Sequence, residues 1–376
     1  MTMGAGPLTK RVGSQRIRTS SIIDEAVAGL PFKNQISVGT VASSLPAEAD
    51  FAICVPARNE EHILPASLAS LIDTVERSGT AGTIVLLINN SADRSWQVAS
   101  SMLEASGCNY LLVKVSLRPA VADAPHARRI ALDIGALLVP DGALLTTDAD
   151  TLVAPNWAAA NLRHIRDGTD LVCGTVSIDP QEYTGLPHSV RRCGEVEAAY
   201  SAELEQLWQR WTGGDAPSFQ IAAMGASLAL PTARYRGIGG MPIPPVAEDK
   251  ALASLARRRD WSIKVASDVT ANTSGRLFAR AAGGMGDALR DRATHNDPYC
   301  DEQLVPLALL QRLADVWNGL QFGTGRYAQF QDAIARDPAL QHRRMRMSQV
   351  MVNLSNAGKE TLDDTTSALR AGGVRA

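Results

Sequence analysis

The stretch "DFAICVPARNEEHILPASLASLIDTVERSGTAGTIVLLINN" (residues 50–90) holds two apolar runs on either side of an amphipathic one. The outer runs, residues 50–57 and 83–90, have the length and continuous apolar character of buried β-strands. Between them, apolar residues recur close to the helical period, and the run ends at Gly79. These apolar residues are Ile63, Leu64, Leu68, Leu71, Ile72 and Val75. A strand–helix–strand unit of this length predicts two parallel strands joined by a helix.

The same alternation continues downstream and predicts the fold class. We expect a helix over 94–107, a strand over 110–116, a helix over 125–139 and a strand over 142–150. The chain is therefore predicted to be an α/β protein with a mostly parallel central sheet flanked by helices. In such sheets, ligands bind beyond the carboxyl ends of the strands. The polar clusters "ARNEE", "NNSAD" and "DAD" follow the first, second and fourth strands, which favours a nucleotide-type site there.

Composition excludes several classes of function. The chain has 376 residues, a formal net charge of −2, 45% hydrophobic and 20% charged residues, as in ordinary soluble globular proteins. Near-neutral charge gives no reason to expect nucleic acid or an anionic membrane as the main partner. No run approaches the roughly 18 apolar residues of a membrane span. Five cysteines without C-x-x-C spacing are expected to be reduced and buried, which fits a cytoplasmic location.

Three regions are expected along the chain. Residues 1–48 begin with the basic, Ser-rich "MTMGAGPLTKRVGSQRIRTSS" and are interpreted as a partly disordered leader. Residues 49–275 carry the alternating strands and helices. Residues 276–376 start with the Gly- and Arg-rich "LFARAAGGMGDALRDRATHNDPYCDE" and continue with helical patterns, so we expect a helical extension that ends in a polar tail.

Two aspartates stand at the end of the predicted fourth strand, in "LLTTDADTLVAPNW" (residues 144–157). Alternate residues of an extended segment point the same way, so Asp148 and Asp150 would project together past the sheet edge. Hard carboxylate oxygens that fill only part of a coordination shell suit Mg²⁺ or Mn²⁺, and such an ion would neutralise a leaving diphosphate. A turn with helix-capping aspartates accounts for the same two residues without a function.

A second acidic pair, Glu248 and Asp249 in "PPVAEDKALASLARRRDW", falls in the first turn of a predicted helix. Acidic residues there complement the helix dipole by about 0.3–1 kcal/mol. The same position also suits a general base that a rigid helix start directs at an acceptor hydroxyl. The residues alone leave both interpretations open.

Six short motifs in order and spacing resemble family 2 glycosyltransferases with the GT-A fold: "VPARNEE", "NNSAD", "ARRIALDIGA", "TTDADT", "GASLALPTARYRGIGGMP" and "AEDKALASLARRR". The resemblance covers about residues 50–275. It implies a hexosyltransferase that depends on Mg²⁺ or Mn²⁺. Such an enzyme would move a sugar from a UDP- or GDP-sugar to a hydroxyl of a small-molecule or glycan acceptor, with inversion.

The resemblance implies a nucleotide site at the first two strand ends. The residues expected to contact base and ribose there are Pro56, Ala57, Arg58 and Glu60. At the second strand end the family often has two aspartates, whereas this chain has Asn89 and Asn90, followed by Asp93. An asparagine can donate to or accept from a pyrimidine edge, so the site is expected to persist while the preference among bases stays open.

For the chemistry, the resemblance implies that Asp150 is the direct metal ligand and that Asp148 supports it and the donor. Asp249 matches the catalytic base, with Glu248 as its neighbour. The glycines of "GASLAL" and "YRGIGGMP", Gly225 among them, match the acceptor-side wall, although tight turns would need them as well.

The third metal ligand and the diphosphate contact are less well defined. Many family members carry a histidine after the E-D helix, but "VASDVTANTSGR" has none, and His295 is the nearest alternative. Arg128 matches the basic residue that usually faces the diphosphate, with Arg129 as a competing candidate. Arg276 and Arg280 would lie on one helix face and could meet the diphosphate instead.

Two other functions remain open from the sequence. One is a retaining transferase of the same fold that acts on a glycerate-type acceptor. The other is a non-catalytic nucleotide-sugar-binding protein whose C-terminal helices contact a partner. Two basic patches, Arg257–Arg259 and Arg343, Arg344 and Arg346, could touch an anionic acceptor, although solvated helix ends explain them more economically.

Overall fold

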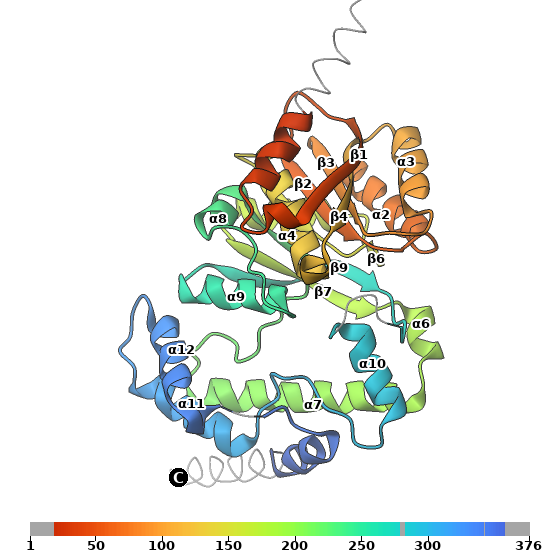
Figure 1. Cartoon of the computed structure of the whole chain (residues 1–376). Helices are drawn as coiled ribbons and strands as arrows, with labels where there is room; N and C mark the ends of the chain where they lie inside the picture. The colour runs from red at the N-terminus through yellow and green to blue at the C-terminus, as the bar shows by residue number, and fades with distance from the viewer. Residues whose placement is uncertain (1–18, 279–282, 342, 358–376) are drawn as a thin grey trace, which may run out of the picture.

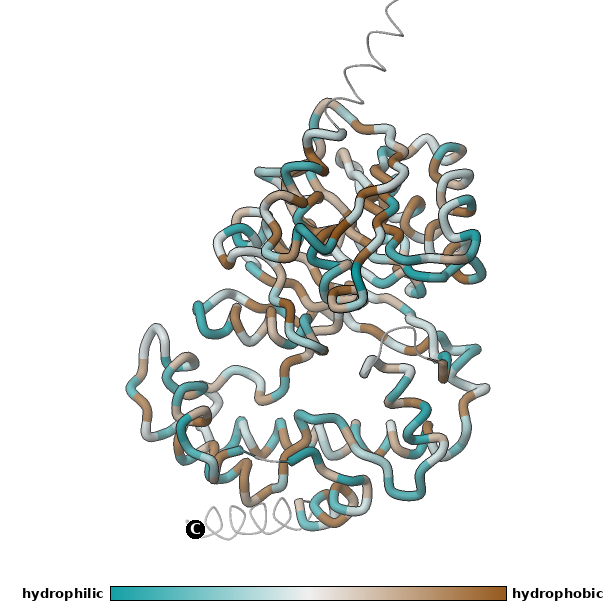
Figure 2. The backbone as a smooth tube through the Cα atoms, in the orientation of Figure 1, coloured by the Kyte–Doolittle hydropathy of each residue, from teal (hydrophilic) through white to brown (hydrophobic). Residues whose placement is uncertain are grey.

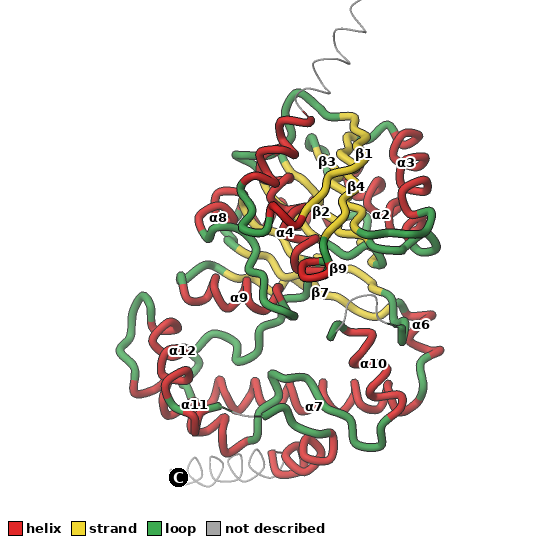
Figure 3. Tube along the Cα trace, viewed as in Figure 1, coloured by secondary structure: helices red, strands yellow, loops and turns green. Residues whose placement is uncertain are grey.

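The computed structural model describes residues 19–278, 283–341 and 343–357. A sheet with its helices forms the upper layer in Figure 1, and helices alone form the lower layer, a division that Figure 3 shows by colour. Within the described residues the sheet has nine strands, in the order β1-β4-β3-β2-β5-β8-β7-β9-β6. The strands are β1 (Ile36–Ser44), β2 (Phe51–Ala57), β3 (Gly82–Asn89), β4 (Asn109–Leu117), β5 (Ala143–Thr146), β6 (Thr151–Val153), β7 (Leu171–Ile178), β8 (Leu228–Pro231) and β9 (Ile263–Thr273).

The helices divide between the two layers. The helices that accompany the sheet are α2 (Leu64–Arg77), α3 (Ser95–Ser106), α4 (Ala124–Leu138), α5 (Trp157–Arg166), α6 (Pro180–Gly185), α8 (Thr232–Gly237) and α9 (Glu248–Arg258). The lower layer contains α7 (His188–Trp211), α10 (Met285–Thr294), α11 (Leu307–Gly319), α12 (Arg326–Arg336) and a helix whose described part is 347–357. Residues 19–28 are helical too, and three short 3-10 turns are η1 (Lys33–Gln35), η2 (Pro119–Val121) and η3 (Pro338–Leu340).

The α/β class that the sequence predicts is confirmed. Strands β4, β3, β2 and β5 are parallel to one another, and both faces of this half are covered. On β2, Ile53 packs in the apolar cluster that contains α2 and α3 residues, whereas Cys54 packs in the cluster that contains α4 residues. This explains the continuous apolar runs, which Figure 2 shows as brown stretches along the strands.

The sheet is mostly parallel, as predicted, and it also contains antiparallel pairs. Strands β1, β8 and β6 each pair antiparallel with a neighbour, β4, β5 and β9 respectively. These three strands do not follow the simple strand–helix–strand alternation. Strand β8 returns to the sheet only after the chain has passed through α7, so local sequence pattern does not reveal its direction.

Part of the segment interpreted as a leader belongs to the sheet. Residues 36–44 form β1, whose Ile36 pairs with Leu117 at one end and Ser44 with Tyr110 at the other. Ile23 and Leu30, which precede β1, are buried in the cluster beneath α4. The basic, Ser-rich start dominates the composition of residues 1–48, whereas β1 draws on a short β-branched run that begins at Ile36.

The lower layer has its own core, and α7 supplies much of it. Tyr200 and Trp208 of α7 pack with Leu310 and Trp317 of α11, and Tyr200 Oη donates to the carbonyl of Val305 at 2.7 Å. Helix α7 precedes residue 275 in the sequence, yet it packs with helices that follow residue 275. The division at residue 275 remains a prediction from the sequence pattern.

Among the helices of the described ranges, none combines the length and the apolar character that crossing a membrane requires.

We expect Leu310→Ala to lower the free energy of unfolding by about 2–5 kcal/mol, because the side chain is fully buried and leaves a cavity between α7 and α11. Val352→Ala is the matched control, since Val352 is 61% exposed and its loss should change stability by no more than about 0.5 kcal/mol. Urea titration followed by circular dichroism measures both. Equal stability of the two variants would contradict the packing described for the lower layer.

Candidate active site

The buried guanidinium of Arg128, on α4, joins three segments that are far apart in the sequence. Its Nε donates to Glu248 Oε1 at 2.9 Å, and its Nη2 donates to Asp148 Oδ1. Its Nη1 donates to Thr146 Oγ1 at 2.9 Å and to the carbonyl of Gly225 at 3.0 Å. Burial alone would lower the pKa of Arg128, but the charges of Asp148 and Glu248 outweigh burial and raise it. Arg128 therefore holds the D-x-D segment against the start of α9.

A second arginine, Arg276, lies between two carboxylates. Its Nη1 and Nη2 donate to Glu60 Oε2 and Oε1, each at 2.7 Å, and its Nη2 lies 2.7 Å from Asp150 Oδ2. Burial, together with the charge of Asp148, raises the pKa of Asp150 to about 7, and Arg276 opposes this rise. The predicted nucleotide residue Glu60 and the predicted metal ligand Asp150 are thus brought together.

The D-x-D segment leaves the sheet in a turn, not in the extended form that the sequence suggests. Strand β5 ends at Thr146, and the N–H of Thr151 donates to the carbonyl of Asp148 at 3.2 Å. Asp148 and Asp150 consequently face different partners, Arg128 and Arg276.

At the start of α9 the two acidic side chains have different partners. Asp249 accepts from the backbone N–H of Gly225 at 2.8 Å and from that of Lys250 at 2.7 Å. Glu248 is paired with Arg128, as described above. Burial, followed by the charge of Glu248, raises the pKa of Asp249, and its two backbone hydrogen bonds moderate the rise.

The residue before this pair has an unusual backbone conformation. Ala247 has φ 60° and ψ 46°, the left-handed region that a residue with a Cβ seldom adopts. Strain of this kind persists only where surrounding contacts enforce it, and it concentrates at functional sites. Sequence pattern gave no sign of it, because alanine is an ordinary residue at a helix start.

The loops after β2 and β3 are tied together by their own side chains. Asn90 donates through Nδ2 to the carbonyl of Leu117 at 2.8 Å and accepts at Oδ1 from the N–H of Leu117 at 3.0 Å. Asp93 accepts from the N–H of Glu61 and from the N–H of Ser95, both at 3.0 Å. The side chains of Asn90 and Asp93 therefore shape this edge of the sheet.

The other expected nucleotide residues lie at the same two strand ends. Pro56 and Ala57 are the last two residues of β2, and Asn89 is the buried last residue of β3. Arg58 Nη1 donates to the carbonyl of Ala122 at 3.0 Å. The first two strand ends are adjacent, since β2 pairs with β3 along its whole length.

His295 is not brought to the aspartates. It follows α10, its side chain is 63% exposed, and its Nδ1 lies 2.9 Å from Asp291 Oδ1 on the same helix. Within residues 19–278, 283–341 and 343–357, no group of three His, Cys, Asp or Glu side chains is arranged to hold a metal ion. Any metal at Asp148 and Asp150 would need its other ligands from donor and water.

Two glycines of the expected acceptor wall make room for arginines. A Cβ at Gly225 would lie 2.8 Å from Arg128 Nη2, and one at Gly240 would lie 2.3 Å from Arg129 Cζ. Arg129 itself pairs with Asp133 at 2.8 Å on α4. Of the further arginine candidates, Arg280 lies outside the described residues.

Comparison with known proteins finds a family match over part of the chain. Residues 52–224 match the family described as Glycosyl transferase family 2. No curated protein matches the chain.

Similar solved structures include three proteins that were solved with a nucleotide or a nucleotide sugar. The mannosyltransferase PcManGT from Pyrobaculum calidifontis, solved with GDP-Man and Mn²⁺, is 15% identical, covers 95% of this chain and 89% of its own, with a TM-score of 0.47. Glucosyl-3-phosphoglycerate synthase from Mycobacterium tuberculosis, solved with Mg²⁺ and UDP, is 15% identical, covers 72% and 81%, with a TM-score of 0.39. TarS from S. aureus, solved with UDP, is 13% identical, covers 77% and 72%, with a TM-score of 0.43.

The match over residues 52–224 spans four of the six motifs and confirms the resemblance there. Residues 52–224 thus carry a glycosyl transferase family 2 domain, and the chain is a glycosyltransferase.

Proposed function

We propose that this enzyme transfers a sugar from a nucleotide-diphosphate donor to an acceptor hydroxyl, with inversion, and that Asp249 is the general base. The observation that supports the proposal is that the two acidic side chains at the start of α9 have different partners. Glu248 is bound to Arg128, whereas Asp249 is fixed by two backbone N–H groups beside the D-x-D segment.

The geometry of Asp249 suits proton transfer. The hydrogen bonds from Gly225 and Lys250 restrict the carboxylate to one orientation, and burial brings its pKa closer to neutral, where a base works best. In the reaction, the acceptor oxygen gives its proton to Asp249 and bonds to the anomeric carbon. The bond from that carbon to the diphosphate breaks on the opposite face, so a single base accounts for inversion.

The donor set of the site fits a divalent cation. Its charged side chains are five carboxylates and two arginines: Glu60, Asp148, Asp150, Glu248, Asp249, Arg128 and Arg276. This excess of hard oxygen donors suits Mg²⁺ or Mn²⁺, held by Asp150 and Asp148 and otherwise by diphosphate and water oxygens. When bound, the ion neutralises charge that develops on the leaving diphosphate.

Arg276 is better placed than Arg128 to meet the donor diphosphate. Its side chain is 27% exposed, against 3% for Arg128, whose donors are directed at protein oxygens. Arg276 also bridges Glu60, at the predicted nucleotide end, and Asp150. We therefore assign the diphosphate contact to Arg276 and a positioning role to Arg128, with a UDP- or GDP-sugar as donor.

The acceptor on this proposal is a small molecule or a glycan. All five cysteines lie within the described residues, each buried with a free thiol, which supports the cytoplasmic location proposed from the sequence. A thermal-shift screen of nucleotide sugars with and without Mn²⁺ identifies base and sugar together, because a donor that binds the folded state raises its melting temperature.

Asp249→Asn is expected to lower turnover by about 10²–10⁴-fold, because it removes general-base assistance and keeps the shape of the side chain. Donor affinity, measured by calorimetry, should stay near that of the wild type. If affinity falls as steeply as rate, Asp249 binds the donor and is not the base. The anomeric configuration of the product, read by NMR, distinguishes inversion from retention.

Asp150→Ala is expected to abolish the part of nucleotide affinity that depends on Mn²⁺, because the direct ligand is lost. His295→Ala is the control and should leave that affinity unchanged, since His295 is paired with Asp291. Calorimetric titration of UDP and GDP with and without Mn²⁺ measures both variants. Unchanged Mn²⁺ dependence in Asp150→Ala would rule out the assigned ligand.

As the pH is lowered, kcat/KM is expected to fall at a higher pH than it would if the base were an aspartate with an ordinary pKa. Asp249 must be ionised to accept a proton, activity is lost as pH falls through its pKa, and burial and the charge of Glu248 raise that pKa. Glu248→Gln removes the neighbouring charge and should move the limb to lower pH. A pH–rate profile in which Glu248→Gln leaves the limb in place would contradict this assignment.

A further inference from the structure

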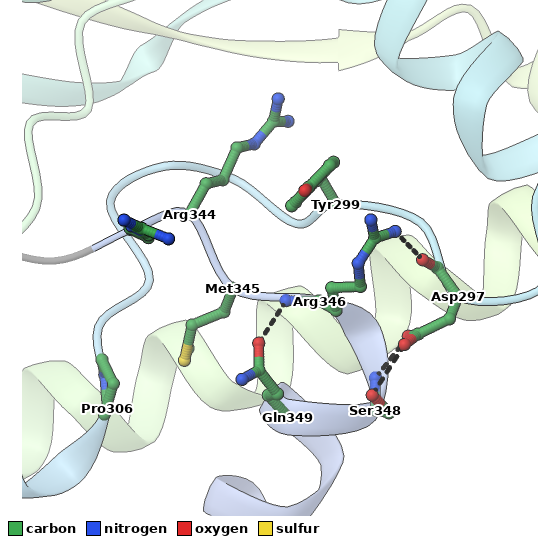
Figure 4. Close-up of a pocket in the computed structure, with 9 residues that line it drawn as sticks. Asp297, Tyr299, Pro306, Arg344, Met345, Arg346, Ser348 and Gln349 are labelled. Carbon is green, nitrogen blue, oxygen red and sulfur yellow. Dashed lines mark hydrogen bonds between the residues drawn. The ribbon is translucent and has the colours of Figure 1, made fainter.

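The lower layer contains a pocket that plays no part in the site described above. It has a volume of about 800 Å³, within the range of ~300–1,000 Å³ typical of small-molecule sites. Figure 4 shows the side chains around it, most of which come from two chain segments. The lining residues are Asp297, Tyr299, Pro306, Arg343, Arg344, Met345, Arg346, Ser348 and Gln349.

The pocket carries an excess of positive charge. Three arginines line it against a single carboxylate, Asp297. Asp297 is already engaged, since its Oδ1 accepts from the N–H of Ser348 and its Oδ2 from Ser348 Oγ, both at 2.8 Å. These hydrogen bonds also lower the pKa of Asp297. Two of the three positive charges therefore have no opposing charge in the lining.

The arginines are held in place by the protein. The guanidinium carbon of Arg346 lies 4.0 Å from the ring centroid of Tyr299, and Arg346 Nη1 donates to the carbonyl of Asp297 at 2.7 Å. Arg344 Nε donates to the carbonyl of Cys300. In Figure 4 the end of the Arg344 side chain points away from the backbone segment that carries Arg344, Met345 and Arg346. Each guanidinium is a planar fork of N–H donors, the kind of group that binds phosphate bidentately.

The two segments are also joined by backbone contacts. Tyr299 and Arg346 form an antiparallel bridge, and the N–H of Cys300 donates to the carbonyl of Met345 at 2.9 Å. The N–H of Met347 donates to the carbonyl of Pro298 at 3.0 Å. These contacts hold the backbone around Arg344 and Arg346 against the segment that carries Tyr299, while both arginine side chains stay exposed.

Two residues that follow Tyr299 in the chain, Asp301 and Glu302, contact α9. Lys250 Nζ lies 3.3 Å from Asp301 Oδ2 and 3.5 Å from Glu302 Oε1, and the N–H of the same lysine holds Asp249. Asp301 is two residues after Tyr299, a separation of at most ~7 Å along the chain.

We propose that this pocket binds the phosphate of a phosphorylated small-molecule acceptor. The inference rests on the proposed function, which requires an acceptor. The two unopposed positive charges match a phosphate monoester, and planar guanidinium groups match its oxygens.

Arginine modification by phenylglyoxal, mapped by mass spectrometry, tests the site. The donor site is first filled with a nucleoside diphosphate and Mn²⁺, so that added phosphate cannot act there. Inorganic phosphate and glycerol 3-phosphate should slow modification of Arg344 and Arg346 several-fold. Arg336 on α12, 80% exposed, is the internal control and should react at an unchanged rate.

Several results would overturn the proposal. One is that phosphate slows the modification of Arg344 and Arg346 no more than that of Arg336. Another is that chloride at matched ionic strength slows the modification of Arg344 and Arg346 as much as phosphate does. A parallel arm replaces the free phosphate with phosphatidylcholine vesicles that contain phosphatidic acid. Protection by these vesicles without protection by glycerol 3-phosphate would assign the pocket to a lipid headgroup and exclude the small-molecule acceptor.

Variants give a second measurement that does not depend on modification. With the donor site filled, phosphate should raise the melting temperature of the wild type and of Arg336→Gln, and Arg344→Gln should lose this response. A full response in Arg344→Gln would contradict the proposal. Nucleotide affinity is measured on the same wild-type sample, so that failure of donor binding, which would overturn the proposed function, is distinguished from failure of the phosphate pocket.

Discussion

The buried guanidinium of Arg128 is the interaction on which the site depends. A charge in that position is tolerable only because carboxylates and carbonyls meet it on several sides, and loss of one partner from such a buried pair typically costs about 3–5 kcal/mol. Asp148 and Glu248 are a hundred residues apart, and their common partner fixes the turn after β5 relative to the start of α9. The requirement extends to Gly225, where a side chain would collide with the arginine.

The charges around Arg128 continue in an alternating order through the site. Glu60 and Asp150 share Arg276, Asp148 and Glu248 share Arg128, and Asp249 stands next to Glu248. Because each carboxylate lies close to the next, a change in charge at Glu60 or Asp150 alters the electrostatic environment of Asp249. On the proposed function, a donor and its cation would change the partners of Arg276 first, since that arginine bridges Glu60 and Asp150.

Much of the upper layer could be predicted from the sequence, because its strands and helices have strong local patterns. The D-x-D and E-D pairs were found for the same reason, as each is a short motif at the end of an element. Strand β1 was missed because its signal is short and follows a polar segment, and the partners of Arg128 were missed because they depend on tertiary contacts. His295 was a candidate ligand only by its distance along the chain, and its ring lies against Asp291 instead, so spacing is a poor guide across a loop. The left-handed conformation of Ala247 has no sequence signature at all.

The course of the chain through α7 has an evolutionary consequence. The chain leaves the sheet for the lower layer, returns for β8, α9 and β9, and then leaves again, so the two layers are interleaved in the sequence. If the residues after β9 were lost, the face of α7 that carries Tyr200, Leu204 and Trp208 would be exposed to water. The lower layer is thus not a module that can be gained, lost or exchanged in one genetic event. Any change in what this layer recognises is expected to accumulate through point substitutions that preserve its contact with α7.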